Sequence, residues 1–434
     1  WNCMPLKIVT KEFTIQLTVF LSVGAALVLV LILVVFGVLP GGKGGRDETS
    51  ITVWVIDEDT DVWKTTVSRF RDSRQDAHVS IEEIPVAIFE DELINALAAD
   101  RGPDVFMFNN KWLVEHGDKV APTPSSKMTI STFSGLFPQV AEQDFISSER
   151  IYAIPLAIDT LALIYNRDIL DAKGVVFPPK TWAEFATAVT KIRTFENATL
   201  TTKAASIGGT SASTRNASDI LSLLMLQNGS PIVNESYTRA DFGSKGETGV
   251  MEYVKYATPQ NPLYTWSDSF GRSNNVFAEE EVAMTFAYPE DVKEILDTNP
   301  FLDFEISAIP QVNVATPVNY ANYWGLTVAS GSQNVNAAWD FVIFATTDRT
   351  SAESYIKKTG HAPALRFLID DYLNDPAIGV FAKQALSAKG WPQPDDDVVS
   401  EAFDDMIKGI TSDEMTVDKA MDEAESTLTE LIRR

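Results

Sequence analysis

The chain has 434 residues with 45% hydrophobic content, which is enough for about two to three globular domains. It contains 35 Lys and Arg residues and 60 Asp and Glu residues, and the resulting net charge of −25 disfavours nucleic acid as a partner. The single cysteine, Cys3, excludes an internal disulfide and any zinc site built from several cysteines.

The N-terminal part contains a long uncharged segment at residues 13–39. As a helix rising ~1.5 Å per residue it would be roughly 40 Å long, more than the ~30 Å hydrocarbon core of a bilayer. A cleavable signal peptide is the alternative, but its apolar part usually has about 7–15 residues. We therefore expect a retained transmembrane anchor at 13–39, followed by a flexible tether at 40–50. Two basic residues flank the segment on each side, Lys7 and Lys11 before it and Lys43 and Arg46 after it, so charge does not determine its orientation.

Strand and helix patterns alternate through the next part of the chain, at 51–56, 62–70, 79–84, 89–97 and 104–108. The order β-α-β-α-β predicts a parallel sheet with helices on its faces, and the first strand reads as buried on both faces. Ligands of such sheets bind beyond the carboxyl ends of the strands.

Aromatic, amide and charged residues gather at the ends of the first and third predicted strands. They are Trp54, Asp57, Glu58, Asp59, Phe108, Asn109, Asn110, Lys111 and Trp112. Each residue alone is compatible with surface exposure or core packing, but together they indicate a pocket.

The segment 151–165 is almost wholly apolar and too long for a typical strand of about five or six residues. It contains one ionisable group, Asp159, whose burial would be costly without a partner. Two interpretations stay open: a structural hydrogen bond to a backbone N–H, or a carboxylate that faces a ligand in a cleft.

Further elements follow in the second half of the chain. A capping box at Thr181 and Glu184 predicts the start of a helix, and a polar loop region at 194–218 contains exposed backbone around Gly209. The acidic runs at 395–397 and 404–405 are interpreted as solvated helix faces. The other expected helices and strands are 166–173, 219–227, 282–286, 304–309, 324–329, 334–347 and 417–431.

Catalytic motifs are not found. The three histidines lie outside metalloprotease spacings, and no nucleophile elbow occurs. The alternating Asp57, Asp59 and Asp61 would suit a calcium loop, but Val62 stands where that loop requires glycine. We therefore expect no enzymatic activity, no cofactor and no metal site.

Several motifs in order carry a resemblance to a known family. They are GPDVF at 102–106, IYAIPLAIDTLALIYNRDIL at 151–170, PPKTWAEF at 178–185, VAMTFAYPEDV at 282–292, ISAIPQV at 306–312, NYANYWGLTVAS at 319–330 and AAWDFVIFATT at 337–347. Over residues 51–434 the chain resembles the family 1 extracellular solute-binding proteins, the maltose-binding-like group that serves sugar ABC importers.

The resemblance implies an α/β fold of the periplasmic-binding-protein type, in which two lobes joined by crossing strands close on a solute. The first lobe would comprise 51–157 and 287–346, and the second 158–286 and 347–434. The segment 151–165 would then contain the first crossing between the lobes.

The resemblance also implies ligand contacts, which we carry over position by position. Asp159 matches a carboxylate that binds sugar hydroxyls, and Glu290 stands where many sugar binders have tryptophan. The full expected set is Trp54, Asp57, Glu58, Asp59, Phe108, Asn109, Asn110, Lys111, Asp159, Gly209, Thr210, Tyr288, Glu290, Tyr323, Trp324 and Trp391.

The function implied by these features is capture of a solute by a single-pass, membrane-anchored extracytoplasmic protein that serves an ABC permease. A sugar or oligosaccharide is the expected solute. The alternatives are a sensory ectodomain that signals through a partner protein, a binder of a cationic solute such as a polyamine, and an anchored hydrolase.

Overall fold

A computed structural model describes residues 49–57 and 60–433. The predicted anchor at 13–39, the tether up to residue 48, and Glu58 and Asp59 lie outside these residues. Among the described helices, none combines the length and the apolar character needed to cross a membrane. Ser50–Gln75 and Val79–Arg434 form one compact unit, which contains the elements discussed below except Thr49 of β1 and the first two residues of β2.

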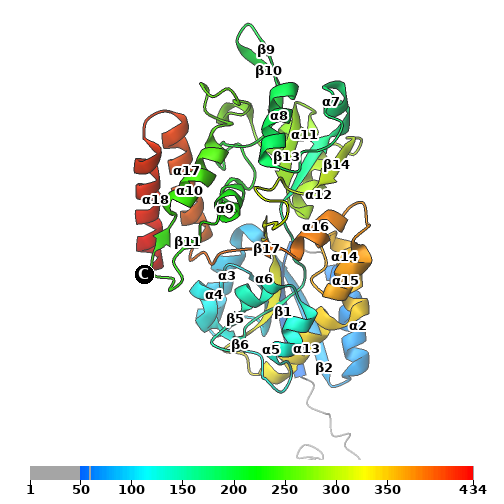
Figure 1. The fold of residues 1–434 in the computed structure, drawn as a ribbon. Helices are drawn as coiled ribbons and strands as arrows, with labels where there is room; N and C mark the ends of the chain where they lie inside the picture. Colours follow the sequence, from blue (N-terminus) through cyan, green and yellow to red (C-terminus); the bar gives the residue numbers. More distant parts are fainter. Residues whose placement is uncertain (1–48, 58–59, 434) are drawn as a thin grey trace, which may run out of the picture. The chain divides into compact units, whose positions relative to one another are not determined.

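The first lobe is built on a six-stranded sheet with the order β2-β1-β3-β16-β4, in which β7 also pairs with β16 (Figure 1). As predicted, β1 and β3 run parallel, with Val53 opposite Val105, whereas β16 runs antiparallel to β3. The strands are β1 (Thr49–Ile56), β2 (Ala77–Ile84), β3 (Val105–Asn109), β4 (Val120–Ala121), β7 (Ile154–Pro155) and β16 (Trp324–Ala329). One difference from expectation is that Thr52 and Trp54 in β1 are only half-buried, so one face of this strand is less covered.

Helices from three parts of the chain complete the first lobe. Phe70 of α2 packs edge-on against Phe341 of α13 at 5.2 Å, and Trp63 contacts Tyr355 of α14 at 5.5 Å. The elements are η1 (Thr60–Trp63), α2 (Lys64–Ser73), α3 (Val86–Ala98), α4 (Leu113–His116), η2 (Gly117–Lys119), α5 (Ile130–Leu136), α6 (Gln139–Phe145), β5 (Ile146–Ser147), β6 (Arg150–Ile151), α13 (Val335–Thr347), α14 (Arg349–Thr359) and α15 (Arg366–Tyr372).

The second lobe is built on a five-stranded sheet with the order β14-β8-β13-β10-β9. The pairing of β10 with β13 is the only parallel one in this sheet. Strand β8 lies between β14 and β13 and runs antiparallel to both. The strands are β8 (Ala162–Asn166), β9 (Thr194–Glu196), β10 (Thr199–Ala205), β13 (Val282–Ala287) and β14 (Phe304–Ser307).

Helices cover this sheet, and the predicted capping box of Thr181 and Glu184 is present at the start of α8. The C-terminal helices α17 and α18 lie side by side (Figure 1), with Phe403 and Leu428 in the main core of the lobe. The elements are α7 (Arg167–Ala172), α8 (Trp182–Ile192), α9 (Ala217–Gln227), β11 (Ile232–Val233), β12 (Ala240–Asp241), α10 (Gly243–Val254), η3 (Asp268–Phe270), α11 (Ser273–Ala278), α12 (Pro289–Thr298), α17 (Asp396–Thr411) and α18 (Val417–Ile432).

The segment 151–165 connects the two sheets, as expected. It contributes β7 to the first sheet and then β8 to the second, and between them Thr160 bridges to Ala321 of a second connection. That second connection contains β15 (Asn319–Tyr320), which pairs in parallel with β17 (Ala388–Lys389); α16 (Gly379–Ala385) precedes β17. Three chain segments therefore lie close together between the lobes.

The pairing differs from the expected lobe boundaries in two places. Residues 287–318, expected in the first lobe, include β14, whose Phe304 pairs with Asn166 of β8, and Ile295, which packs with Ile164. Residues of α14, expected in the second lobe, pack on η1 and α2. Tyr288 and Glu290 accordingly lie on the second lobe and not in a crossing strand. Strand pairing and helix packing between residues far apart in the sequence decide to which lobe β14 and α14 belong.

Candidate functional site

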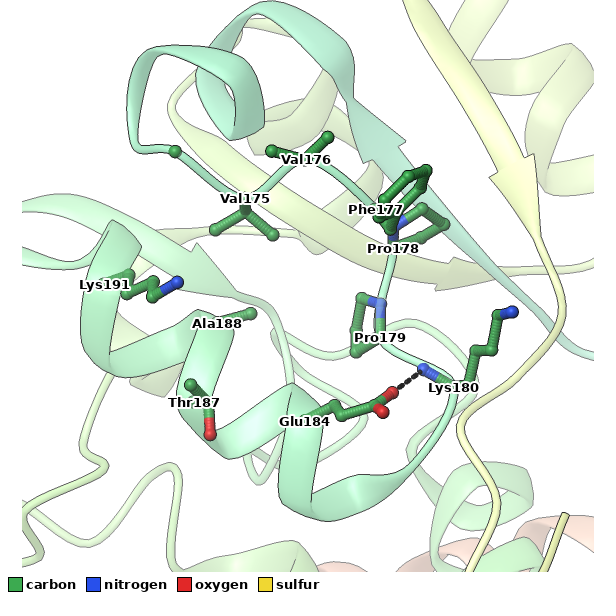
Figure 2. A pocket seen from close by; sticks show the side chains of 11 residues that line it. Val175, Val176, Phe177, Pro178, Pro179, Lys180, Glu184, Thr187, Ala188 and Lys191 are labelled. Carbon is green, nitrogen blue, oxygen red and sulfur yellow. Dashed lines mark hydrogen bonds between the residues drawn. The ribbon is translucent and has the colours of Figure 1, made fainter.

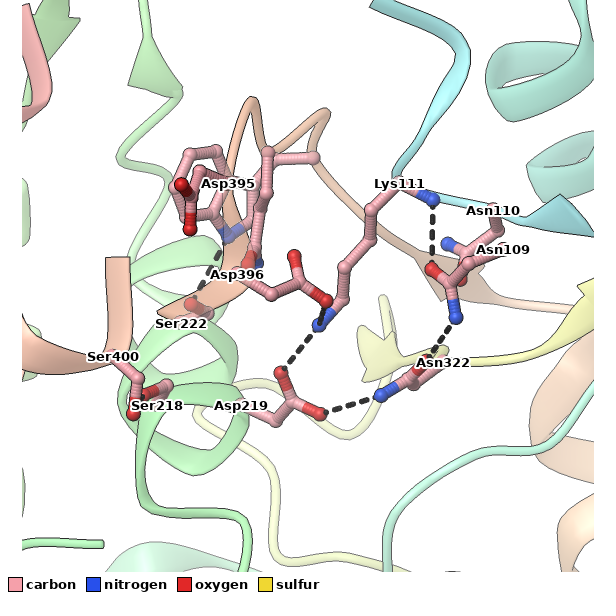
Figure 3. Close-up of polar contacts among 12 residues, drawn as sticks. Asn109, Asn110, Lys111, Ser218, Asp219, Ser222, Asn322, Asp395, Asp396 and Ser400 are labelled. Carbon is pink, nitrogen blue, oxygen red and sulfur yellow. Dashed lines mark hydrogen bonds and ion pairs between the residues drawn. The ribbon is translucent and has the colours of Figure 1, made fainter. Parts of the chain in front are cut away.

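The ammonium of Lys111 lies at the centre of a buried polar cluster that joins the lobes (Figure 3). Lys111 follows β3 of the first lobe, and its Nζ lies 3.2 Å from Oδ1 of Asp219 in α9 and 3.6 Å from Oδ2 of Asp396 in α17. The Lys111 side chain is only 6% exposed. One cation therefore pairs with two carboxylates of the opposite lobe.

Electrostatics keeps Lys111 protonated. Burial alone would lower the pKa of Lys111, but the negative charges of Asp219 and then Asp396 raise it well above its ordinary value. Burial raises the pKa of Asp396, which Lys111 partly offsets. Asp396 was expected on a solvated helix face, and its side chain is 40% exposed, but the expectation missed its ion pair with Lys111 of the first lobe.

Neutral donors complete the surroundings of Asp219. Its Oδ2 accepts hydrogen bonds from the hydroxyl of Tyr288 at 2.9 Å and from Nδ2 of Asn322 at 3.2 Å. Asn109 in turn donates to Oδ1 of Asn322 at 3.1 Å, and its own Oδ1 accepts from the backbone N–H of Lys111. Carboxylate, amide, hydroxyl and ammonium groups thus converge, which is chemistry suited to hydroxyl groups of a ligand.

A small cavity of about 160 Å³ adjoins this cluster. The rings of Trp112 and Trp324 meet edge to face in its wall, with centroids 5.1 Å apart. Its lining residues are Val86, Phe89, Glu90, Asn109, Trp112, Trp324 and Asp396. The cavity combines aromatic surface from the first lobe with a carboxylate from the second.

Asp159 already has protein partners for both carboxylate oxygens. Oδ1 accepts from the backbone N–H of Ala362 at 2.9 Å, and Oδ2 lies 2.6 Å from Nδ1 of His361. The first of these contacts is the structural hydrogen bond that the sequence left open as one interpretation. These bonds tie the first crossing to the segment after α14.

Glu290 lies near Asp159 and His361 but on the second lobe. Desolvation by surrounding protein raises the pKa of Glu290 to about 7, Asp291 adds to the rise, and His361 opposes it. The side chain nevertheless stays accessible to solvent. It is therefore free to meet a ligand, unlike Asp159.

Asp291 was not anticipated from the sequence. Its fully buried carboxylate accepts from Nε of Arg215 at 2.8 Å, from Nδ2 of Asn216 at 2.7 Å and from the backbone N–H of Tyr288 at 2.9 Å. These bonds cap α12 and fix the backbone that aims the Tyr288 hydroxyl at Asp219. The run Tyr-Pro-Glu-Asp, with proline in the first turn and an acid at the third helical position, was the available signal.

Asn110 and Tyr323 both bond to Asp144. Oδ1 of Asn110 accepts from the backbone N–H of Tyr323, and both the Asn110 amide and the Tyr323 hydroxyl donate to Oδ2 of Asp144, at 3.0 Å and 2.8 Å. Burial raises the pKa of Asp144 to about 7, although these hydrogen bonds lower it. The trio fastens the β3 loop and the second connection to α6.

The remaining expected residues lie elsewhere. Nε1 of Trp54 donates to Glu82, and Asp57 accepts from the backbone of Val86. Phe108 is completely buried in the core of the first lobe. In the second lobe, Trp391 donates to Ser222 at 3.0 Å, Gly209 accepts from Tyr253, and Thr210 is held by Asp268. The structure does not bring these residues into the Lys111 cluster.

Two larger hollows, of about 610 and 620 Å³, lie on the second lobe alone. The first is formed by the loop between α7 and α8 and by one face of α8 (Figure 2). Val176 and Phe177, which line this hollow, are 73% and 78% exposed. Neither hollow contains residues from the first lobe, so size alone does not identify the site.

The comparisons with known proteins agree with this two-lobed arrangement. Residues 66–408 match the sequence profile of a family described as bacterial extracellular solute-binding protein. The chain belongs to this family. The match extends over both lobes and confirms the resemblance inferred from the motifs.

Relatives of this solute-binding protein include a maltotriose-binding protein of Pyrococcus abyssi, 23% identical over 73% of this chain and 67% of the relative. Two solved structures have the same fold. The sugar-binding protein MalE of Xanthomonas citri gives a TM-score of 0.75 at 20% identity, covering 88% of this chain and 97% of that one. A cyclic alpha-maltosyl-1,6-maltose binding protein from Arthrobacter globiformis gives 0.76 at 17% identity, covering 89% and 99%.

Membership of this family supports a binding role and not a catalytic one. It also supports an extracytoplasmic location for the two-lobed part of the solute-binding protein.

Proposed function

We propose that this protein captures a sugar or oligosaccharide between its lobes and delivers it to an ABC permease. The observation that carries the proposal is the Lys111–Asp219–Asp396 cluster beside the cavity of Trp112 and Trp324. It places hydrogen-bonding groups from both lobes next to aromatic rings.

This combination suits a carbohydrate. Aromatic rings cover the C–H faces of a pyranose, while charged and amide groups take its hydroxyls. A hydrogen bond to a charged group contributes about 1.5–3 kcal/mol net, more than a neutral one. The cavity is small for an oligosaccharide, so the lobes would separate to admit one and close on it. The names of the relatives, which bind maltotriose and a cyclic maltose derivative, support the same class of solute.

A cationic solute is supported less. Asp219 and Asp396 already share the ammonium of Lys111, and Asp159 pairs with His361. A polyamine would have to compete with a buried lysine. The sensory alternative needs a signalling partner, and no feature of the described residues favours it over transport.

Membrane attachment is the second part of the proposal. The uncharged segment 13–39 would anchor the protein, and residues 40–50 would give the lobes reach toward the permease. Alkaline carbonate extraction of membranes that carry the full chain tests this part. Retention in the pellet supports the anchor, and release after deletion of 13–39 is expected; release of the full chain would contradict it.

The solute is tested by calorimetric titration of the full chain, kept in mild detergent, with maltotriose, other maltodextrins, raffinose and spermidine. We expect saturable binding of at least one oligosaccharide and none of spermidine. Binding of spermidine alone would overturn the sugar assignment.

Variants locate the binding site. Asp219→Asn and Trp112→Ala should weaken the binding about tenfold or more, because they remove a charged acceptor and an aromatic face. Asp418→Asn, on an exposed position of α18, is the matched control and should bind as the unchanged protein does. Full affinity in both site variants would place the solute elsewhere.

A further inference from the structure

Three potential metal ligands converge at the edge of the cavity, and only Glu90 of the three lines it. Glu90 lies in α3, and Glu115 and His116 lie in α4. One oxygen of each glutamate and one ring nitrogen of His116 all lie within 4.8 Å of one another. Nε2 of His116 is 2.8 Å from Oε1 of Glu90 and 3.9 Å from Oε2 of Glu115.

The imidazole is held in place by packing. The His116 side chain is only 10% exposed, and its ring meets Trp112 edge to face at 5.4 Å. Glu90 and Glu115 stay 46% and 33% exposed, so they can adjust to an ion that arrives from solvent. A fixed nitrogen ligand with two adjustable carboxylates is a favourable arrangement for binding a cation.

Negative charge accumulates at this place without a compensating Lys or Arg. Within the described residues, the ion pairs of Glu90 and Glu115 involve His116 alone. Two carboxylates therefore face one imidazole. Asp396 of the second lobe lines the same cavity as Glu90, but it pairs with Lys111.

Space for the remaining ligands of an ion is present. Glu90 and Asp396 both line the cavity of about 160 Å³. A water molecule occupies about 30 Å³ of liquid, so the cavity can hold several. A cation between Glu90 and His116 would have open coordination positions on this side.

We propose that Glu90, Glu115 and His116 form a binding site for a divalent transition-metal cation, with zinc as the best-suited ion. Imidazole and carboxylate ligands bind zinc at about 2.0–2.2 Å, whereas calcium and magnesium prefer oxygen ligands alone. The ion would lie between the ring nitrogen of His116 and the two glutamates. It would also reduce the repulsion between these glutamates and Asp396, which lines the same cavity from the second lobe.

The test is calorimetric titration of the chelator-treated full chain with zinc, calcium and magnesium salts, in the absence of any sugar. We expect one zinc ion per chain, with calcium and magnesium much weaker. The variants Glu90→Gln and Glu115→Gln keep side-chain shape and should each weaken zinc binding by about tenfold or more. His116→Gln should do the same. His78→Gln, which changes an exposed histidine of β2, is the matched control and should leave zinc binding unchanged.

X-ray absorption spectroscopy at the zinc edge identifies the ligand atoms, which a folding defect alone would not change. We expect one histidine nitrogen and otherwise oxygen ligands around the ion, and the loss of the histidine signal in His116→Gln. Absence of stoichiometric binding, or full binding in the two glutamine variants, would overturn the proposal. Because no sugar is present, this result is independent of whether the solute assignment holds.

Discussion

At the scale of single residues, the key distinction is between carboxylates that protein groups already occupy and those that remain available. Asp159 is occupied at both oxygens, since the backbone of Ala362 and the ring of His361 take one each. Sequence reasoning identified it as an unusual buried acid. It could not show where His361 lies, because the two residues are far apart in the chain and meet only through folding.

Replacement of Asp159 tests which role dominates. Asp159→Ala leaves the Ala362 N–H unpaired and should lower the free energy of unfolding by about 1–3 kcal/mol. Urea denaturation measures the loss. Sugar affinity should fall less than in Asp219→Asn. Unchanged stability with abolished binding would instead assign Asp159 to the ligand.

Asp144 provides a prediction about pH. Because its folded-state pKa of about 7 lies above the usual 3.8, the folded protein binds its proton more tightly than the unfolded chain does. This group therefore lowers stability progressively as the pH rises from about 4 to about 7, with the full loss above that range.

The test compares unfolding midpoints of the unchanged protein and Asp144→Asn across that pH range. Asparagine keeps an oxygen that accepts from Asn110 and Tyr323 but carries no charge. The variant should gain stability relative to the unchanged protein as the pH rises toward 7. A constant difference at all pH values would show that Asp144 does not titrate there.

At the scale of elements, local pattern predicted most of the strands and helices. β16 at Trp324–Ala329 has the expected bounds, and α9 and α18 differ by at most two residues at either end. What could not be predicted was the pairing of β14 with β8, or the packing of α14 on α2. Those contacts depend on the order of the strands in each sheet and on the path of the chain between the lobes, and the local hydrophobic pattern contains neither. Asp219 and Asp396 were missed as partners of Lys111 for the same reason.

The start of α12 should be unusually sensitive to substitution. Asp291→Ala leaves Arg215, Asn216 and the Tyr288 N–H without their buried acceptor, and should cost about 3 kcal/mol of stability. Denaturant unfolding is the measurement. The control on the same helix is Asp297→Ala, whose exposed pairing with Lys293 should be worth less than about 0.5 kcal/mol. Equal effects would show that the Asp291 network contributes little.

At the scale of the whole molecule, the ion pairs of Lys111 connect two lobes that each have a sheet of their own. A double-mutant cycle of Lys111→Met and Asp219→Asn should give a coupling energy of about 1–3 kcal/mol, because the pair is desolvated. The exposed pair of Lys293 and Asp297 should give about 0.3–0.5 kcal/mol in the same experiment. A Lys111–Asp219 coupling as small as this would mean that the lobes are not held together by these charges.

The paired indoles of Trp112 and Trp324 have an optical consequence. Of the other described tryptophans, Trp63, Trp182, Trp266, Trp339 and Trp391 are at most 5% exposed and Trp54 is half-buried, and all six lie outside this cavity. Their emission should therefore stay constant when the cavity fills. The cavity pair, beside the carboxylate of Asp396, should change in intensity and wavelength as water there is displaced. The protein thus contains its own fluorescent reporter of occupancy, and binding can be followed in real time without attaching a dye.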